Sequence, residues 1–292
     1  MSNPSLHFQT KSELLEWFQK ELPDSHKEYL NTLTVIKSSG HAGFVSLCKR
    51  GDDETIKNFI TFLTELNIGN ILHHKNVRNL SYEPKDIAGI DFRYDDILLS
   101  VKSLDTKDYE RAEHGKLETL KAAGGGTDTF PHKVFSHTSL EVEKTEWDTY
   151  SYSRTETGNG AFLGSDIDQM SAPLQHLGEF ESQANINGYK KVLFFVPYSP
   201  EFRHYHALDI GLWYFDLLPS QYRGVFHDPD WYWKLFKQES KKKNIDAIIF
   251  AFPPRPLIWP TGCFNDISHG KRRMLIFASD ADFHKRLESV FL

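Results

Sequence analysis

The sequence has few cysteines and no long apolar run. Only two cysteines, Cys48 and Cys263, occur among 292 residues, and they form no CxxC pair. Neither a disulfide framework nor a cysteine-based zinc site is therefore expected. No stretch approaches the roughly 18 apolar residues of a membrane helix, and the N-terminus lacks the charged-then-apolar pattern of a signal peptide. We expect a cytoplasmic protein without a membrane partner.

The chain also lacks an excess of basic charge. Its formal net charge is −6 at pH 7 and its pI is about 6.2. This balance argues against avid, non-specific binding of nucleic acid, although it is compatible with a local basic cleft. The length and the apolar fraction of 39% are sufficient for a substantial core, in one large domain or two smaller ones.

The most informative stretch that is present covers residues 86–104. Apolar and polar residues alternate there on both sides of Asp95-Asp96. This pattern predicts two antiparallel strands joined by a two-residue turn, with Tyr94 paired to Ile97.

In this register three polar side chains come together. Asp91 lies opposite Ser100, and Lys102 lies diagonal to Asp91. A carboxylate, a hydroxyl and an ammonium are therefore expected to converge on one face of the sheet, with an apolar layer behind them.

This arrangement resembles the PD-(D/E)xK motif of the restriction-endonuclease-like nucleases. The resemblance assigns the metal-binding aspartate to Asp91 and a further metal ligand to the carbonyl of Val101. It makes Lys102 the lysine that orients or deprotonates the attacking water, and it implies Mg²⁺ as cofactor and DNA as partner. Two positions depart from the motif. Gly89-Ile90 stands where the family has proline, and Ser100 stands where it has glutamate.

The serine leaves the metal site short of a carboxylate, because a hydroxyl is a poor Mg²⁺ ligand beside one. A variant found in some type II restriction enzymes has Ser-x-Lys on the strand and takes the missing carboxylate from the following helix. Here that helix is predicted over 173–187, so Glu181 is the first candidate for this catalytic, metal-binding role and Glu179 the second. In other members, junction resolvases among them, the first helix contributes a glutamate, which leaves Glu54 and Glu65 as alternatives.

Residues 1–50 are predicted to form an N-terminal helical arm. Thr10 and Glu13 make a capping box at the start of a first helix, and Asp24 or Ser25 caps a second. Such an arm packs on its domain, contacts DNA or mediates a homodimer, and packing on the domain is the most common of these outcomes.

Residues 51–292 are predicted to form a nuclease-like α/β domain, with a mixed central sheet flanked by helices. A helix followed by a strand and then the Asp91–Lys102 hairpin is the opening order of the nuclease superfamily. The patterns behind this prediction are a helix over 52–67, a strand starting near 71–74, buried strands over 191–197, 246–252 and 274–278, and a closing helix over 281–291.

Residues 105–170 interrupt this pattern. They are rich in Gly, Ser and Thr and show little periodicity, apart from a hairpin expected around 145–154. A stretch of this length without regular structure is usually functional or disordered. We predict a loop-rich insertion that forms a flap over the site.

Two other functions are open at this point. Because Ser100 replaces the glutamate, the chain is alternatively a catalytically inactive nuclease-fold protein that serves as a binding or interaction scaffold. Glu201, His204 and His206 form an ExxHxH cluster that would serve a metal-dependent hydrolase, but it lacks a third spaced ligand, and surface histidines explain it more simply. The favoured prediction is a Mg²⁺-dependent DNA endonuclease, such as a type II restriction enzyme or another defence nuclease.

Overall fold

The chain divides into two compact units. The first comprises Met1–Asp105, Gln175–Pro200 and Lys242–Leu292, and the second comprises Thr106–Leu174 and Glu201–Lys241. The computed structural model describes residues 10–104, 137–144, 150–157, 173–181, 186, 188–197, 202, 204–215, 244–253, 259, 264, 267–268 and 271–292. Within these ranges no helix has the length and apolarity that crossing a membrane requires.

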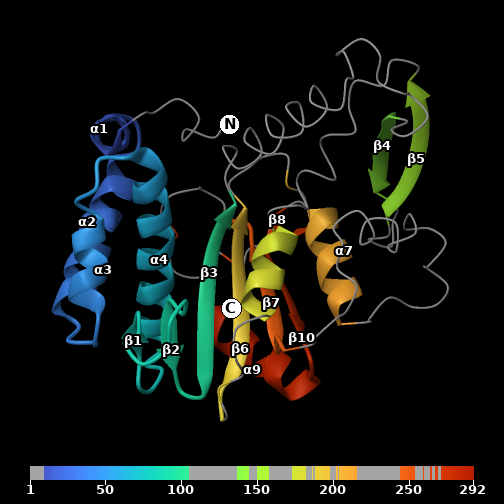
Figure 1. The fold of residues 1–292 in the computed structure, drawn as a ribbon. Coiled ribbons are helices and arrows are strands. Elements are labelled where there is room, and N and C mark those ends of the chain that lie inside the picture. Colours follow the sequence, from blue (N-terminus) through green and yellow to red (C-terminus); the bar gives the residue numbers. More distant parts are fainter. Residues whose placement is uncertain are drawn as a thin grey trace, which may run out of the picture. The chain divides into compact units, whose positions relative to one another are not determined.

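A six-stranded mixed sheet forms the centre of the first unit (Figure 1). In spatial order its strands are β1 (Ser81–Tyr82), β2 (Phe92–Tyr94), β3 (Ile97–Leu104), β6 (Lys190–Pro197), β7 (Ala247–Ala251) and β10 (Met274–Ala278). β1, β2 and β3 are antiparallel neighbours, β6 and β7 continue the sheet in parallel with β3, and β10 is antiparallel to β7. The central strands β6 and β7 are apolar and buried nearly throughout, as expected of strands covered on both faces.

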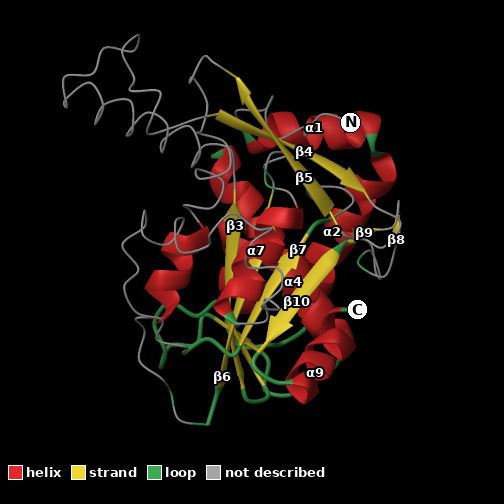
Figure 2. Cartoon of the chain, turned by 90° about the vertical axis from the view of Figure 1, so that its right-hand side faces the viewer, coloured by secondary structure: helices red, strands yellow, loops and turns green. Residues whose placement is uncertain are grey.

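Helices cover both faces of this sheet, as the sequence predicts. α4 (Ile56–His74) and α9 (Ala281–Phe291) share one core with the strand residues of one face, and α9 lies alongside β10 (Figure 2). The helix over 173–181 packs on the other face, where the Lys191 ammonium donates a hydrogen bond to the Phe180 carbonyl at 2.6 Å. The domain therefore has a helix–sheet–helix architecture.

The N-terminal helices form a further layer on α4. They are α1 (Lys11–Glu21), α2 (Pro23–Ser38) and α3 (Phe44–Arg50), and their buried residues belong to the same core as α4. The capping box predicted at Thr10 and Glu13 is confirmed. The second helix begins two or three residues earlier than expected, because Pro23 takes the first helical position, where its missing N–H costs nothing.

α4 extends further than its sequence pattern predicts. The prediction of a strand near 71–74 is wrong, because these residues form the last turn of α4. Gly69 lies inside the helix, and the rings of Phe44 and Phe92 pack against it. A Cβ atom added there would lie only 3.5 and 3.4 Å from those rings. Leu72 is fully buried and continues the apolar side of the helix beyond the glycine.

The β2–β3 hairpin has the predicted register. Tyr94 pairs with Ile97 across the Asp95-Asp96 turn. Asp95 has φ +47°, a left-handed conformation that aspartate tolerates better than most residues. Arg286 of α9 forms ion pairs with both turn aspartates, so the C-terminal helix holds the end of the hairpin.

Most of the insertion predicted over 105–170 lies outside the described residues. Within it, β4 (His137–Lys144) and β5 (Tyr150–Thr157) form an antiparallel hairpin that is longer than the one expected around 145–154. These strands and α7 (His204–Tyr214) belong to the second compact unit. The region predicted as one domain over 51–292 thus contributes to both units.

Gly43 allows α3 to lie directly against β1. Its φ is +82°, and a Cβ atom at this position would lie 2.0 Å from the carbonyl oxygen of Tyr82. The Tyr82 N–H donates a hydrogen bond to the carbonyl of Ala42, the residue before Gly43, at 2.9 Å. The backbones of these two segments are therefore in contact, and no side chain fits between them.

Substitution of Gly43 by alanine is expected to destabilise the protein more than substitution of Gly40. Gly40 has a similar φ of +72°, but a Cβ atom added there would have no neighbouring atom within 4 Å, so alanine adds only the cost of the left-handed conformation. That cost is about 1–2 kcal/mol. At Gly43 the β1 backbone must also move. Urea unfolding of both variants measures the difference, and equal losses would show that α3 and β1 separate readily.

Candidate metal centre

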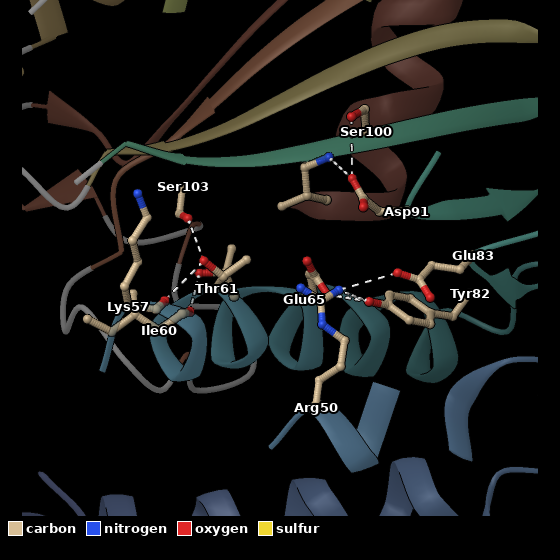
Figure 3. A network of polar contacts seen from close by, with 12 residues as sticks. Arg50, Lys57, Ile60, Thr61, Glu65, Tyr82, Glu83, Asp91, Ser100 and Ser103 are labelled. Carbon is tan, nitrogen blue, oxygen red and sulfur yellow. Dashed lines mark hydrogen bonds and ion pairs between the residues drawn. The ribbon is translucent and has the colours of Figure 1, made fainter. Parts of the chain in front are cut away.

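Asp91 lies at the edge of β3, immediately before β2 begins (Figure 3). Its Oδ2 atom accepts hydrogen bonds from the Val101 N–H at 2.6 Å and from the Ser100 hydroxyl at 3.3 Å. β2 contains three residues whereas β3 contains eight. The carboxylate therefore occupies the position beside β3 that the backbone of a longer β2 would fill.

The position of Asp91 lets it reach both faces of the sheet. Ser103 of β3 shares a hydrogen bond of 3.2 Å with Thr61 of α4, so the odd-numbered residues of β3 face α4. By alternation, Ser100 and Lys102 project from the opposite face. The Asp91 carboxylate accepts a hydrogen bond from a backbone N–H, and backbone N–H groups lie in the plane of the sheet. The carboxylate therefore lies between the two faces. The expectation of a single polar face therefore applies to the serine and the lysine, whereas the aspartate belongs to both sides.

Glu65 lies on the α4 side of this edge, close to Asp91 (Figure 3). Its side chain is only 3% exposed. Its Oε2 atom accepts hydrogen bonds from Arg50 Nη1 at 2.7 Å and from the Tyr82 hydroxyl at 2.6 Å. Arg50 also contacts the Tyr82 hydroxyl, and Glu83 at 3.5 Å. The buried glutamate is thus held by donors from α3 and β1.

The hydrogen bonds of both carboxylates fall on one oxygen each. Those of Asp91 fall on Oδ2 and those of Glu65 on Oε2, and no donor among the described residues bonds Oδ1 or Oε1. Figure 3 shows the two carboxylates facing each other across the space between β3 and α4. Two carboxylate oxygens are therefore available to a shared ligand.

Burial disfavours the ionised form of both carboxyl groups, and the charge of Asp91 adds to this effect at Glu65. Burial, and then the charge of Asp91, raises the pKa of Glu65 to about 7, despite the opposing effects of Arg50 and Tyr82. Burial also raises the pKa of Asp91, against the hydrogen bond from Val101 and the charge of Lys102. Both acids therefore hold their protons more tightly than exposed carboxyl groups do, mainly because they are buried.

This acid pair fits a hard divalent cation such as Mg²⁺. Such an ion typically binds one or two carboxylates and keeps several waters, and its charge would favour the ionised form of both groups. The carbonyl of Val101 points to the same strand edge as its N–H, which bonds Asp91. Within the described part of the chain, no three Asp, Glu, His or Cys side chains gather into a metal site. The backbone and water would have to complete the coordination here.

Glu65, and not Glu181, is the carboxylate that the structure places with Asp91. Glu181 lies on the helix over 173–181, where its charge acts on Lys191 of β6. The geometry therefore does not support Glu181 as the displaced carboxylate. It supports the alternative, Glu65 on α4.

The other two alternatives have contacts of their own, and the hydrogen bond from Gln175, helped by the charge of Lys102, lowers the pKa of Glu179. Glu179 is exposed and accepts a hydrogen bond from Gln175 at 2.9 Å. Glu54 precedes α4 instead of lying on it. It pairs with Lys11 at 3.6 Å and accepts a hydrogen bond from Ser12 at 2.9 Å, so it joins α1 to the start of α4.

Of the ExxHxH cluster, the structure describes the side chain of His206 alone. Glu201 and the side chain of His204 lie outside the described residues. His206 is 1% exposed, and its ring lies 5.2 Å from that of Phe202. The interpretation of this histidine as a surface residue is therefore wrong.

Sequence reasoning did not identify Arg50 and Tyr82 as site residues. Arg50 ends a short helix in a run of charged residues, and Tyr82 belongs to a two-residue strand. Neither position carries a periodic signal or a motif. Only their contacts with Glu65 reveal them.

Comparisons of the chain with protein-family models, with curated proteins and with solved structures find no match. The site is thus defined by its own geometry, as a buried pair of carboxylates between a helix and a strand edge.

Glu65→Gln is expected to alter how stability depends on pH. The pKa of Glu65 in the folded state, about 7, lies above its ordinary value of 4.5. The stabilisation of the folded state by the proton on Glu65 is therefore fully present below about pH 4.5 and is lost as the pH rises through about 7. Without divalent cations, the wild type should lose roughly 1–3 kcal/mol relative to Glu65→Gln between about pH 5 and 8. Urea unfolding at several pH values checks this, and a constant difference between the two proteins would contradict it.

Proposed function

We propose that this protein is a Mg²⁺-dependent DNA endonuclease with a restriction-endonuclease-like fold. The observation that carries the proposal is the buried Asp91–Glu65 pair beside the strand that bears Lys102. The order of the elements also supports the proposal. It runs α4, β1, the β2–β3 hairpin, the helix over 173–181 and β6, which is the order implied by the hairpin's resemblance to the nuclease motif.

Asp91 and Glu65 would hold the metal, together with the carbonyl of Val101. When bound, Mg²⁺ supplies electrostatic stabilisation for the charge that develops on the phosphodiester during hydrolysis. Ser100 acts differently from the glutamate that it replaces, because it is 1% exposed and donates its hydroxyl to Asp91. The serine thus orients the aspartate, and Glu65 supplies the second negative charge.

Lys102 provides the base or the orienting group for water. It is half-buried, and its charge lowers the pKa of Asp91, which opposes the effect of burial on that carboxyl. An ammonium whose charge acts on Asp91 can hold the attacking water by a hydrogen bond or receive its proton after losing its own. By alternation from Ser103, Lys102 projects from the face opposite α4 and would approach the site from that side.

A polar seam between α4 and β3 offers contacts to a DNA backbone. Thr61 and Ser103 meet there at 3.2 Å, and Lys57 lies one helical turn further from Glu65 (Figure 3). Hydroxyl and ammonium groups are common ligands of backbone phosphates. In a protein with a net charge of −6, such local contacts are needed for DNA to approach an acidic site.

The direct test is a cleavage assay on supercoiled plasmid and on double- and single-stranded oligonucleotides. We expect cleavage with Mg²⁺ and none with EDTA. Asp91→Asn, purified in parallel, controls for contaminating nucleases. A wild-type protein that binds Mg²⁺ yet cuts none of these substrates would contradict the proposal.

A second candidate function is a non-catalytic scaffold, and Arg50 favours it. The guanidinium already forms an ion pair with Glu65 at 2.7 Å, so the acid pair has a partial counter-charge from the protein itself. The presence of Ser100 where the motif has glutamate also favours a scaffold. A scaffold would bind DNA or another partner with an affinity that does not depend on Mg²⁺.

A further inference from the structure

One short segment, Ser81-Tyr82-Glu83, contacts both members of the acid pair. The Tyr82 hydroxyl donates to Glu65 Oε2 at 2.6 Å, and the Glu83 N–H donates to the Asp91 carbonyl at 2.9 Å. Consecutive residues thus hold Glu65 through its side chain and Asp91 through its backbone. The separation of the two carboxylates therefore depends on β1.

The Tyr82 phenol is itself fixed from three directions. It is 1% exposed, and its ring lies 5.3 Å from that of Phe92 on the next strand. Its N–H bonds the carbonyl of Ala42, and its carbonyl lies where a side chain on Gly43 would have to stand. The backbone of Tyr82 is therefore held against the segment that leads into α3, and its buried ring packs on β2.

We infer that Tyr82 is a positioning residue, which holds Glu65 so that Oε1 faces Asp91 and is available to a divalent cation. Tyr82 and Arg50 both donate to Oε2 and thereby select which oxygen is presented. Hydrogen-bond partners of metal-binding carboxylates orient them in this way. The inference rests on the proposed metal site, although Tyr82 itself would touch neither metal nor DNA.

Arg50 alone is a weaker support for Glu65. Its side chain is 38% exposed, and it divides its donors among Glu65, Tyr82 and Glu83. Without the phenol hydroxyl, the glutamate would keep only this flexible partner and would sample other rotamers. Loss of the hydroxyl should therefore weaken cation binding more than it weakens the fold.

Tyr82→Phe tests the inference, with Tyr94→Phe as a matched control. Tyr94 is fully buried on β2, and its hydroxyl has no hydrogen-bond partner among the described residues. Mn²⁺ binding to the purified proteins is measured by calorimetry without DNA, and folding is checked by thermal melting. We expect Tyr82→Phe to weaken Mn²⁺ binding about tenfold or more, and Tyr94→Phe to leave it unchanged. Cleavage by Tyr82→Phe should return toward the wild-type rate at high Mn²⁺, because only affinity is lost.

The outcomes separate this inference from the proposed function. Equal Mn²⁺ affinity in Tyr82→Phe and wild type would overturn the inference and leave the metal site standing. A rate that stays low at saturating Mn²⁺ would overturn it too, because Tyr82 would then act on the chemistry. A wild type that binds no Mn²⁺ would overturn both. If the wild type binds Mn²⁺ but cuts no DNA, a weakened Tyr82→Phe still supports the positioning role, although the nuclease proposal fails.

Discussion

Changing Asp91 to asparagine is expected to remove Mg²⁺ binding and DNA cleavage together, while the fold is kept. Asparagine has nearly the same shape, and its side-chain oxygen can still accept the N–H of Val101, which Asp91 bonds at 2.6 Å. What disappears is the negative charge that the cation requires. Cleavage should fall by about a thousandfold or more, as when a residue of an interdependent catalytic set is lost.

The stability of Asp91→Asn gives an independent check. Burial raises the pKa of Asp91, and its charge raises that of Glu65, so removing one of these charges relieves their repulsion. In EDTA above pH 7, Asp91→Asn should be at least as stable as the wild type. Asp86→Asn is the control, because Asp86 is exposed and pairs with Arg93. Wild-type cleavage by Asp91→Asn would place the active site elsewhere.

The second large effect is expected from Lys102→Ala. If the ammonium orients or deprotonates the attacking water, its loss should lower the cleavage rate by about a hundredfold or more, within the range for a general acid–base group. Mg²⁺ affinity should stay the same or rise, because Lys102 places positive charge near Asp91. Single-turnover cleavage at saturating Mg²⁺ separates the rate from the affinity.

The control for this variant is Lys75→Ala. Lys75 is exposed at the end of α4, where its ammonium donates to the carbonyl of Ser289. It should cut DNA at the wild-type rate. Undiminished cleavage by Lys102→Ala would remove the lysine from the mechanism, and a joint loss of folding and Mg²⁺ binding would make its role structural.

The hairpin that carries Asp91 could be predicted from the sequence because its determinants are local. Alternating polarity and the Asp95-Asp96 turn together fix the register, and the observed pairing of Tyr94 with Ile97 agrees with it. The same holds for the closing elements β10 and α9, whose bounds match the prediction. The pattern of α9 displays its buried side plainly, whereas β10 is apolar throughout although only Met274 and Phe277 are buried.

The partner of Asp91 could not be selected in this way. Glu65 lies on a helix that is buried on nearly all sides, between the sheet and the outer helices, so periodicity does not distinguish its sheet-facing side. The resemblance to the Ser-x-Lys variant pointed instead to the helix that bears Glu181. Arg50 and Tyr82 depend on long-range contacts, and the helix that ends at Arg50 was not predicted at all.

The central claim is that Asp91 and Glu65 form one cation site. Calorimetric titration of Mg²⁺ into the wild type, Asp91→Asn, Glu65→Gln and the double variant tests it most directly. We predict that the wild type binds Mg²⁺ and that each single change removes most of the affinity. The double variant should then be little worse than either single one, because residues that share a ligand are not additive. Wild-type Mg²⁺ affinity in Glu65→Gln would contradict the account.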